Sequence, residues 1–231
     1  YRDKDEILIW PPESMPDGSR SVAGETASGP SLHEIAGNTR LLLHCGMGLL
    51  MNYFMTSLFF AIPYELKGFI EPQAFWKIIT SIMVGSVLVM IPAMRWADKG
   101  RVREVIQCGF ALECLCAVVL MAPPTFFRLV LSLGLFVSGY VLLAPSLPSA
   151  LARGYDSSHY GSVMGLYSMF LFFGSFLGAT VSGLLYSRGL VWIGISLVAL
   201  GLAGGWMNFR LRGFAIVPPG EAGEGADQDS R

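Results

Sequence analysis

Long apolar segments separated by short polar ones make up most of this chain. Six such segments cover residues 41–63, 75–97, 105–122, 126–151, 161–186 and 190–209. A helix needs about 20 residues to cross a hydrocarbon core of roughly 30 Å, and a soluble helix of that length normally keeps a polar face. The pattern therefore predicts an all-α membrane protein in which residues 39–212 form a bundle of six transmembrane helices.

The two ends of the chain differ from this bundle in composition. Residues 1–38 and 213–231 are rich in Pro, Gly, Glu and Asp. Such segments carry too little apolar surface to offset the entropy lost on folding. We expect a disordered cytosolic linker before the bundle and a disordered cytosolic tail after it. Because the chain begins with Tyr1 and has no signal-peptide pattern near that end, we also expect it to be a fragment.

Charge and motifs exclude several other classes of protein. The net charge of -1 gives no reason to expect nucleic acid as a partner. His33 and Glu34 begin a metalloprotease-like motif, but Gly37 stands where the second histidine ligand belongs. No nucleophile, base and orienting residue follow a pattern that we can defend. The sequence therefore predicts no enzyme, no bound metal and no cofactor.

The basic residues between the segments predict an orientation. If the first helix starts in the cytosol, eight basic residues flank the cytosolic ends of the segments and four flank the outer ends. The cytosolic set is Arg40, Arg95, Lys99, Arg101, Arg103, Arg153, Arg210 and Arg212, and the outer set is Lys67, Lys77, Arg128 and Arg188. Since cytosolic loops of membrane proteins carry the excess of Lys and Arg, we expect both termini in the cytosol.

The turn between the second and third segments carries the most specific motif. It contains Asp98, Lys99, Gly100, Arg101 and Arg103. These residues resemble the loop signature of the major facilitator superfamily, Gly-x-x-x-Asp-Arg/Lys-x-Gly-Arg followed by another basic residue. The chain lacks one residue between Lys99 and Gly100 and has no glycine at the leading position. Taken alone, the turn is also compatible with a cytosolic hairpin that carries ordinary positive charges.

Small residues recur along the fifth segment. Gly161, Gly165, Ser168, Ser175, Ala179 and Ser182 share one helical face, and Gly174 and Gly178 form a small-xxx-small pair beside it. Small side chains let a neighbouring helix approach closely, either in static packing or at a moving interface. The segment resembles the eleventh helix of the bacterial drug-efflux branch of the same superfamily.

Together, the linker, the segments and both motifs resemble the central loop and helices seven to twelve of a twelve-helix major facilitator transporter. The stretch 75–103 is similar to YajR-type multidrug efflux proteins. The resemblance implies half of a fold built from inverted three-helix repeats, with the missing N-terminal half as its partner. It also implies proton-coupled efflux of lipophilic drug-like compounds by alternating access, in the inner membrane of a bacterium. Uptake or facilitated transport of a small metabolite, and a non-transporting scaffold, remain alternatives.

Family architecture places the first, second, fourth and fifth segments at the central cavity. In the first, Met47, Met51 and Met55 form an i, i+4, i+8 row beside Asn52 and Tyr53. Methionine side chains adapt to varied apolar solutes, although the row is equally compatible with a core or lipid face. Tyr140 in the fourth segment is a further cavity candidate, on a helix where Pro145 and Pro148 set either a hinge or a permanent kink.

Two ionisable residues inside the segments are candidates for proton coupling. His44 titrates near neutral pH in its ordinary state, but its closeness to Arg40 also fits an interfacial histidine. Glu113 lies near the middle of the third segment with no basic residue close in sequence, and buried acids in membranes are often functional. The family places this helix at the periphery. The resemblance also implies that Asp98 latches the cytosolic side shut against a helix of the other half.

Overall fold

The computed structural model describes residues 38–123, 125–154 and 160–211. These residues form α2 (Thr39–Leu66), α3 (Pro72–Trp96), the π-helical turn η1 (Ala97–Arg101), α4 (Val102–Leu120), α5 (Phe126–Ala152), α6 (Tyr160–Tyr186) and α7 (Leu190–Arg210). The described part of the chain has no β-strand. The predicted linker, apart from Asn38, and the predicted tail lie outside the described residues.

Each predicted apolar segment coincides with one α-helix, and the ends agree within three residues. Local signals explain several of these ends. The side chain of Asn38 accepts hydrogen bonds from the backbone N–H groups of Arg40 and Leu41, at 3.1 and 3.3 Å, and so caps α2. Pro72 occupies the first turn of α3, where the missing N–H has no intrahelical partner to lose.

By length and composition alone, five stretches of the described chain could cross a membrane. Four of them are α2, α5, α6 and α7, and the fifth, Ala74–Leu120, contains most of α3 together with η1 and α4. Gly100 reverses the chain inside this stretch at φ 83°, a conformation that favours glycine. Crossing by all six helices separately remains a prediction.

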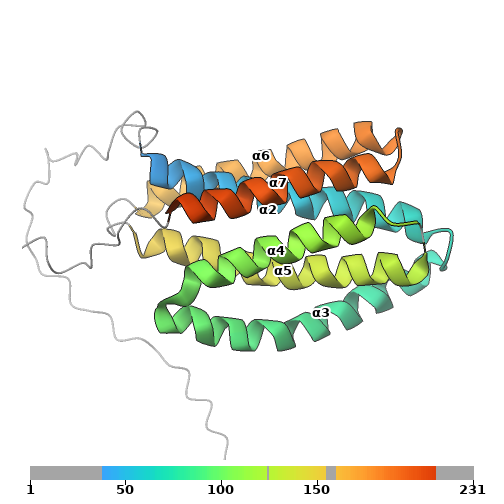
Figure 1. Ribbon diagram of the computed structural model, residues 1–231, viewed down its shortest axis with the longest axis horizontal. Helices are drawn as coiled ribbons and strands as arrows, with labels where there is room; N and C mark the ends of the chain where they lie inside the picture. Colours follow the sequence, from blue (N-terminus) through green and yellow to red (C-terminus); the bar gives the residue numbers. More distant parts are fainter. Residues whose placement is uncertain (1–37, 124, 155–159, 212–231) are drawn as a thin grey trace, which may run out of the picture.

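The helices lie roughly parallel or antiparallel in one bundle (Figure 1). α2 packs most extensively on α6, while α4 packs on α5 and α7. α3 lies at the edge of the bundle and makes its main contact with α5. We call the end that contains η1 the turn end, and the end that contains residues 67–71 and 187–189 the loop end.

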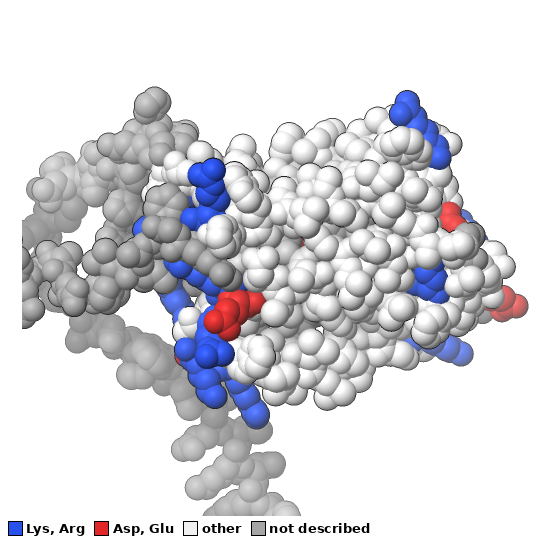
Figure 2. Space-filling model, in the orientation of Figure 1, with Lys and Arg blue, Asp and Glu red and all other residues white. Residues whose placement is uncertain are grey.

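Charged side chains gather at these two ends, and the face shown in Figure 2 has an uncharged band between them. Large apolar side chains are exposed on the outside of the helices; examples are Leu88 on α3, Phe172 on α6 and Leu202 on α7. Exposed apolar surface of this extent suits hydrocarbon rather than water as the surrounding solvent. The charged ends then lie at the level of the lipid headgroups.

Candidate functional site

The methionine row of α2 points mainly into the bundle. Met47 and Met51 are buried in a core cluster at the turn end, together with Tyr167 of α6. Tyr53 is buried in a second cluster toward the loop end, and Met55 is half-buried against it. In this conformation a solute would reach Met47 or Met51 only after neighbouring helices had moved. Their role in lining a cavity stays a prediction.

The other two cavity candidates are more accessible. Asn52 is half-buried, and its Nδ2 donates to the backbone carbonyl of Leu171 in α6 at 3.0 Å. Tyr140 is half-buried on α5, with its ring centroid 5.9 Å from that of Phe136. Asn52 therefore joins two helices, which leaves fewer of its hydrogen-bonding atoms available for a ligand.

Glycines bring the backbones of α2 and α6 into direct contact. A Cβ atom on Gly174 would lie 2.1 Å from the carbonyl oxygen of Leu49, and one on Gly178 would lie 2.6 Å from that of Tyr53. The hydroxyl of Ser57 donates to the Gly178 carbonyl at 3.4 Å, across the same contact. These two predicted packing glycines therefore form the close approach between α2 and α6.

Gly161 and Gly165, the other two predicted packing glycines, have different surroundings. A Cβ atom at either position would meet no atom within 4 Å in the described part of the chain. Both lie near the start of α6, on an exposed part of its surface. Any helix that packs on them belongs to a partner outside the described bundle, so their packing role stays a prediction.

Glu113 is enclosed where α4 crosses α5. Its side chain is 0% exposed, and both carboxyl oxygens lack a hydrogen-bond partner among the described residues. The crossing depends on two glycines, because a Cβ atom on Gly139 would lie 2.9 Å from the Gly109 carbonyl oxygen and 3.2 Å from Cγ of Glu113. The lone acid in the third segment pointed to Glu113 itself, but its sequence spacing gave no sign of this glycine crossing.

His44 lies at the turn end rather than in the middle of the bundle. It is half-buried, and its Nδ1 is 2.9 Å from the backbone carbonyl of Arg40, one helical turn earlier. In the Nδ1-protonated tautomer, the ring donates to that carbonyl. Glu113 is on a different helix and belongs to a different part of the core, so the structure does not bring the two proton-coupling candidates together.

The turn residues are mostly exposed. Asp98 makes no ion pair with any described residue. Nη1 of Arg101 lies 3.7 Å from Oε2 of Glu104, and both side chains of this pair are exposed. Lys99 and Gly100 have non-helical backbone angles, which reverse the chain between α3 and α4. The backbone carbonyl of Arg103 accepts from Nδ2 of Asn208 at 3.0 Å, which fixes the start of α4 against α7. The anchored turn thus holds Asp98 out into solvent.

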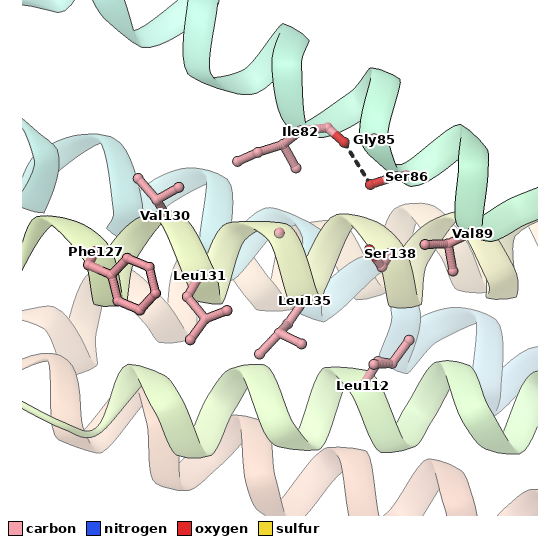
Figure 3. Close-up of a pocket in the computed structure, with 11 residues that line it drawn as sticks. Ile82, Gly85, Ser86, Val89, Leu112, Phe127, Val130, Leu131, Leu135 and Ser138 are labelled. Atoms are coloured by element: carbon pink, nitrogen blue, oxygen red, sulfur yellow. Dashed lines mark hydrogen bonds between the residues drawn. The ribbon is translucent and has the colours of Figure 1, made fainter.

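A cavity of about 470 Å³ lies between α3 and α5 (Figure 3). Its lining is largely apolar and includes Val89 of α3, Leu112 of α4 and Leu131 of α5. The hydroxyl of Ser86, which also lines it, already donates to the Ile82 carbonyl at 2.8 Å. None of the six predicted cavity residues lines this space.

A sequence model of the Major Facilitator Superfamily matches residues 43–229. The chain belongs to this superfamily. It is also 27% identical over 206 residues to "Inner membrane transport protein YajR" of Escherichia coli (strain K12), a match that covers 85% of this chain and 44% of that protein. The chain thus spans less than half the length of this relative.

Membership of the major facilitator superfamily explains the composition of the bundle. The chain is an integral, multi-pass membrane protein of a transporter family rather than an enzyme. The superfamily match includes the turn that carries Asp98 and Arg101, and it includes all of α6. Sequence reasoning missed one feature of this bundle. Arg128, counted among the outer flanking charges, is buried at the start of α5 with Nε and Nη2 unpaired among the described residues.

Proposed function

We propose that this chain is one half of a proton-coupled exporter of lipophilic, drug-like compounds. The complete protein would have twelve helices in inverted three-helix repeats, and it would work by alternating access in the inner membrane of a bacterium, with both termini of this chain in the cytosol. Its partners would be the other six-helix half, the small-molecule substrate, protons and lipid. Superfamily membership and the partial coverage of a longer relative support this architecture.

The buried, unpaired carboxyl group of Glu113 is the observation that supports proton coupling. An ionised carboxylate without a hydrogen-bond partner is very expensive to bury, whereas a protonated carboxyl costs much less. Burial of Glu113 in the α4–α5 crossing is therefore linked to proton binding. If α4 and α5 separate enough to admit water in one transport state, the proton is released in that state. Among the described residues, Tyr140 on α5 and Cys114 and Cys116 on α4 are titratable groups that interact electrostatically with this acid.

Surface chemistry supports a lipophilic substrate. α6 exposes Met169, Phe172, Phe173 and Phe176, and the cavity between α3 and α5 is lined mainly by aliphatic side chains. Flexible and aromatic side chains accept varied apolar molecules without fixed polar partners. Transport of a lipophilic solute, measured as below, distinguishes this role from simple contact of the same surfaces with lipid.

The exposed turn suits the proposed latch. Asp98 is solvent-accessible and unpaired among the described residues, so it is available to the start of a helix in the other half. Helix N-termini bind carboxylates through free N–H groups and the helix dipole. We expect Asp98→Asn in the intact transporter to shift the population toward the inward-facing state without abolishing ligand binding. Distances between the two halves that stay unchanged would reduce Asp98 to a solvated charge.

The deciding experiment uses the intact, natively encoded protein in proteoliposomes. A lipophilic fluorescent cation should accumulate when a pH gradient is imposed, and an uncoupler should abolish this accumulation. Glu113→Gln keeps the shape of the side chain but cannot release a proton, so we expect it to lose gradient-driven accumulation. Glu71→Gln, at an exposed site just before α3 and away from the proposed latch, is the control and should retain it.

Other outcomes would contradict the proposal in distinct ways. Full accumulation by Glu113→Gln would place proton coupling at another residue. Movement of a polar metabolite down its gradient, with no response to pH, would favour facilitated transport. Saturable ligand binding without movement of any solute tested would favour a scaffold.

A further inference from the structure

A second cavity, of about 390 Å³, lies at the loop end where two helices finish and two begin. Glu65 lines it from the end of α2, and Ala122 lines it just beyond α4. Arg128 lines it from the first turn of α5, and Leu190 and Val191 line it from the first turn of α7. The cavity therefore combines one acid and one base with an apolar wall.

Arg128 has an incomplete set of partners at this cavity. Its side chain is 6% exposed, and Nη1 donates to the backbone carbonyl of Ala122. Nε and Nη2 are buried and have no hydrogen-bond partner among the described residues. These two nitrogens form the edge of a guanidinium that holds a phosphate or carboxylate through two parallel hydrogen bonds. A buried cation with this edge empty is destabilising unless an anion completes it.

Glu65 does not complete it. Its Oε1 accepts a hydrogen bond from the hydroxyl of Tyr186 at 3.1 Å, and it forms no ion pair with Arg128 in the described part of the chain. The helix starts also lack negative charge near Arg128. Neither α5 nor α7 has an acidic residue in its first turn, and α7 has no side-chain cap. The positive ends of two helix dipoles thus lie beside an arginine that interacts with Glu65 electrostatically but forms no ion pair with it in the described part of the chain.

We propose that this cavity binds the phosphate group of a membrane phospholipid. Because Nε and Nη2 of Arg128 have almost no accessible surface in this conformation, the guanidinium would turn toward the cavity and then donate from both nitrogens to two phosphate oxygens. Leu190 and Val191 would contact the glycerol backbone and the first acyl carbons. The position of Arg128 in the membrane supports a lipid. Arg128 is the third residue of an apolar helix and so lies near the level of the lipid headgroups. Free phosphate would use the same two nitrogens but would gain nothing from the apolar wall.

The test uses the intact protein, purified and stripped of lipid in a neutral detergent. Thermal unfolding is followed during titration with short-chain phosphatidylglycerol, with diacylglycerol of the same chains, and with inorganic phosphate. A ligand that binds only the folded state raises the melting temperature in proportion to its occupancy. We expect phosphatidylglycerol to raise it at concentrations where diacylglycerol and phosphate have little effect.

Variants then assign the site. Arg128→Gln should weaken phosphatidylglycerol binding about tenfold or more, because it removes two charge-assisted hydrogen bonds. The affinity of Arg128→Lys for phosphatidylglycerol should lie between those of Arg128→Gln and the wild type. Glu65→Gln should tighten binding a few-fold by removing a nearby negative charge, and it does not depend on Arg128 substitutions folding well. Arg188→Gln, at an exposed arginine of the same end, is the matched control and should bind as wild type.

Three results would overturn the proposal. Equal stabilisation by diacylglycerol and phosphatidylglycerol would show that the phosphate is not recognised. Equal affinity for inorganic phosphate would make this a free-anion site rather than a lipid site. Binding that appears only in Glu65→Gln would show that an internal Glu65–Arg128 pair fills the site in the native protein. Because none of these measurements involves transport, the outcome is independent of the proposed export function.

Discussion

α2 and α3 are both long, apolar helices, but they are held in the bundle in opposite ways. α2 buries residues along its whole length and meets the backbone of α6 at Gly174 and Gly178. α3 buries little besides Ser86, and a Cβ atom on its Gly85 would meet nothing within 4 Å. Apolarity alone therefore does not determine which membrane helix is tightly packed. Tight packing depends on direct backbone contact at small residues.

This difference divides the bundle into a tight pair and a loosely attached helix. Closely packed interfaces resist small deformations, because every displacement breaks many contacts at once. A helix with one modest contact can shift at lower cost. We expect the α2–α6 pair to move as one body during any conformational change, while α3 adjusts its position beside α5.

The largest expected effect comes from filling the α2–α6 contact. Gly174→Leu should prevent the pair from forming, because even a Cβ atom at this position would overlap the Leu49 carbonyl. We expect little folded protein, measured as monodisperse material after purification at equal expression. Gly183→Leu lies on the same helix where a Cβ atom meets nothing, so it is the matched control and should purify normally. Equal yields of both variants would mean that α2 and α6 are not in backbone contact.

A smaller effect should distinguish a buried leucine of α2 from an exposed leucine of α3. Leu58 of α2 is 0% exposed, whereas Leu88 of α3 is 71% exposed. In lipid, a leucine is held mainly by packing, so Leu58→Ala should cost roughly 2 kcal/mol through the cavity that it leaves. Leu88→Ala should change the free energy of unfolding by less than about 0.5 kcal/mol. Reversible unfolding in mixed micelles measures both, and equal losses would remove the distinction between the helices.

The sequence predicts the bounds of the helices well because long apolar runs end at polar residues. The ends of α5 and α6 agree with the predicted segments within one residue, since apolar runs stop where charged or turn residues begin. Which helix packs on which cannot be read in the same way. In a soluble protein the buried face is apolar and the exposed face polar, but here both faces are apolar. Buried Leu58 and exposed Leu88 carry the same side chain.

The candidate site shows the same limit. Gly165 and Gly178 look alike in sequence, but only Gly178 meets a neighbouring backbone, because the geometry of α2 decides the contact. The Met47 pattern fits a cavity wall and a core face equally, and in this conformation Met47 lies in the core. Glu113 was visible as an isolated acid in an apolar run. Arg128 was not recognised, since a basic residue at a segment end is usually solvated.

The most direct test of a tight α2–α6 pair beside an adjustable α3 is a spin-label distance measurement on the intact transporter. One label pair joins Leu42 of α2 to Leu184 of α6, and the other joins Leu88 of α3 to Leu184; all three sites are exposed. On a change of pH or addition of substrate, the Leu42–Leu184 distance should stay narrow and constant, while the Leu88–Leu184 distribution should be broader and should shift. A shift of the Leu42–Leu184 distance as large as that of the Leu88–Leu184 distance would contradict the division of this bundle into a tight pair and a loosely attached helix.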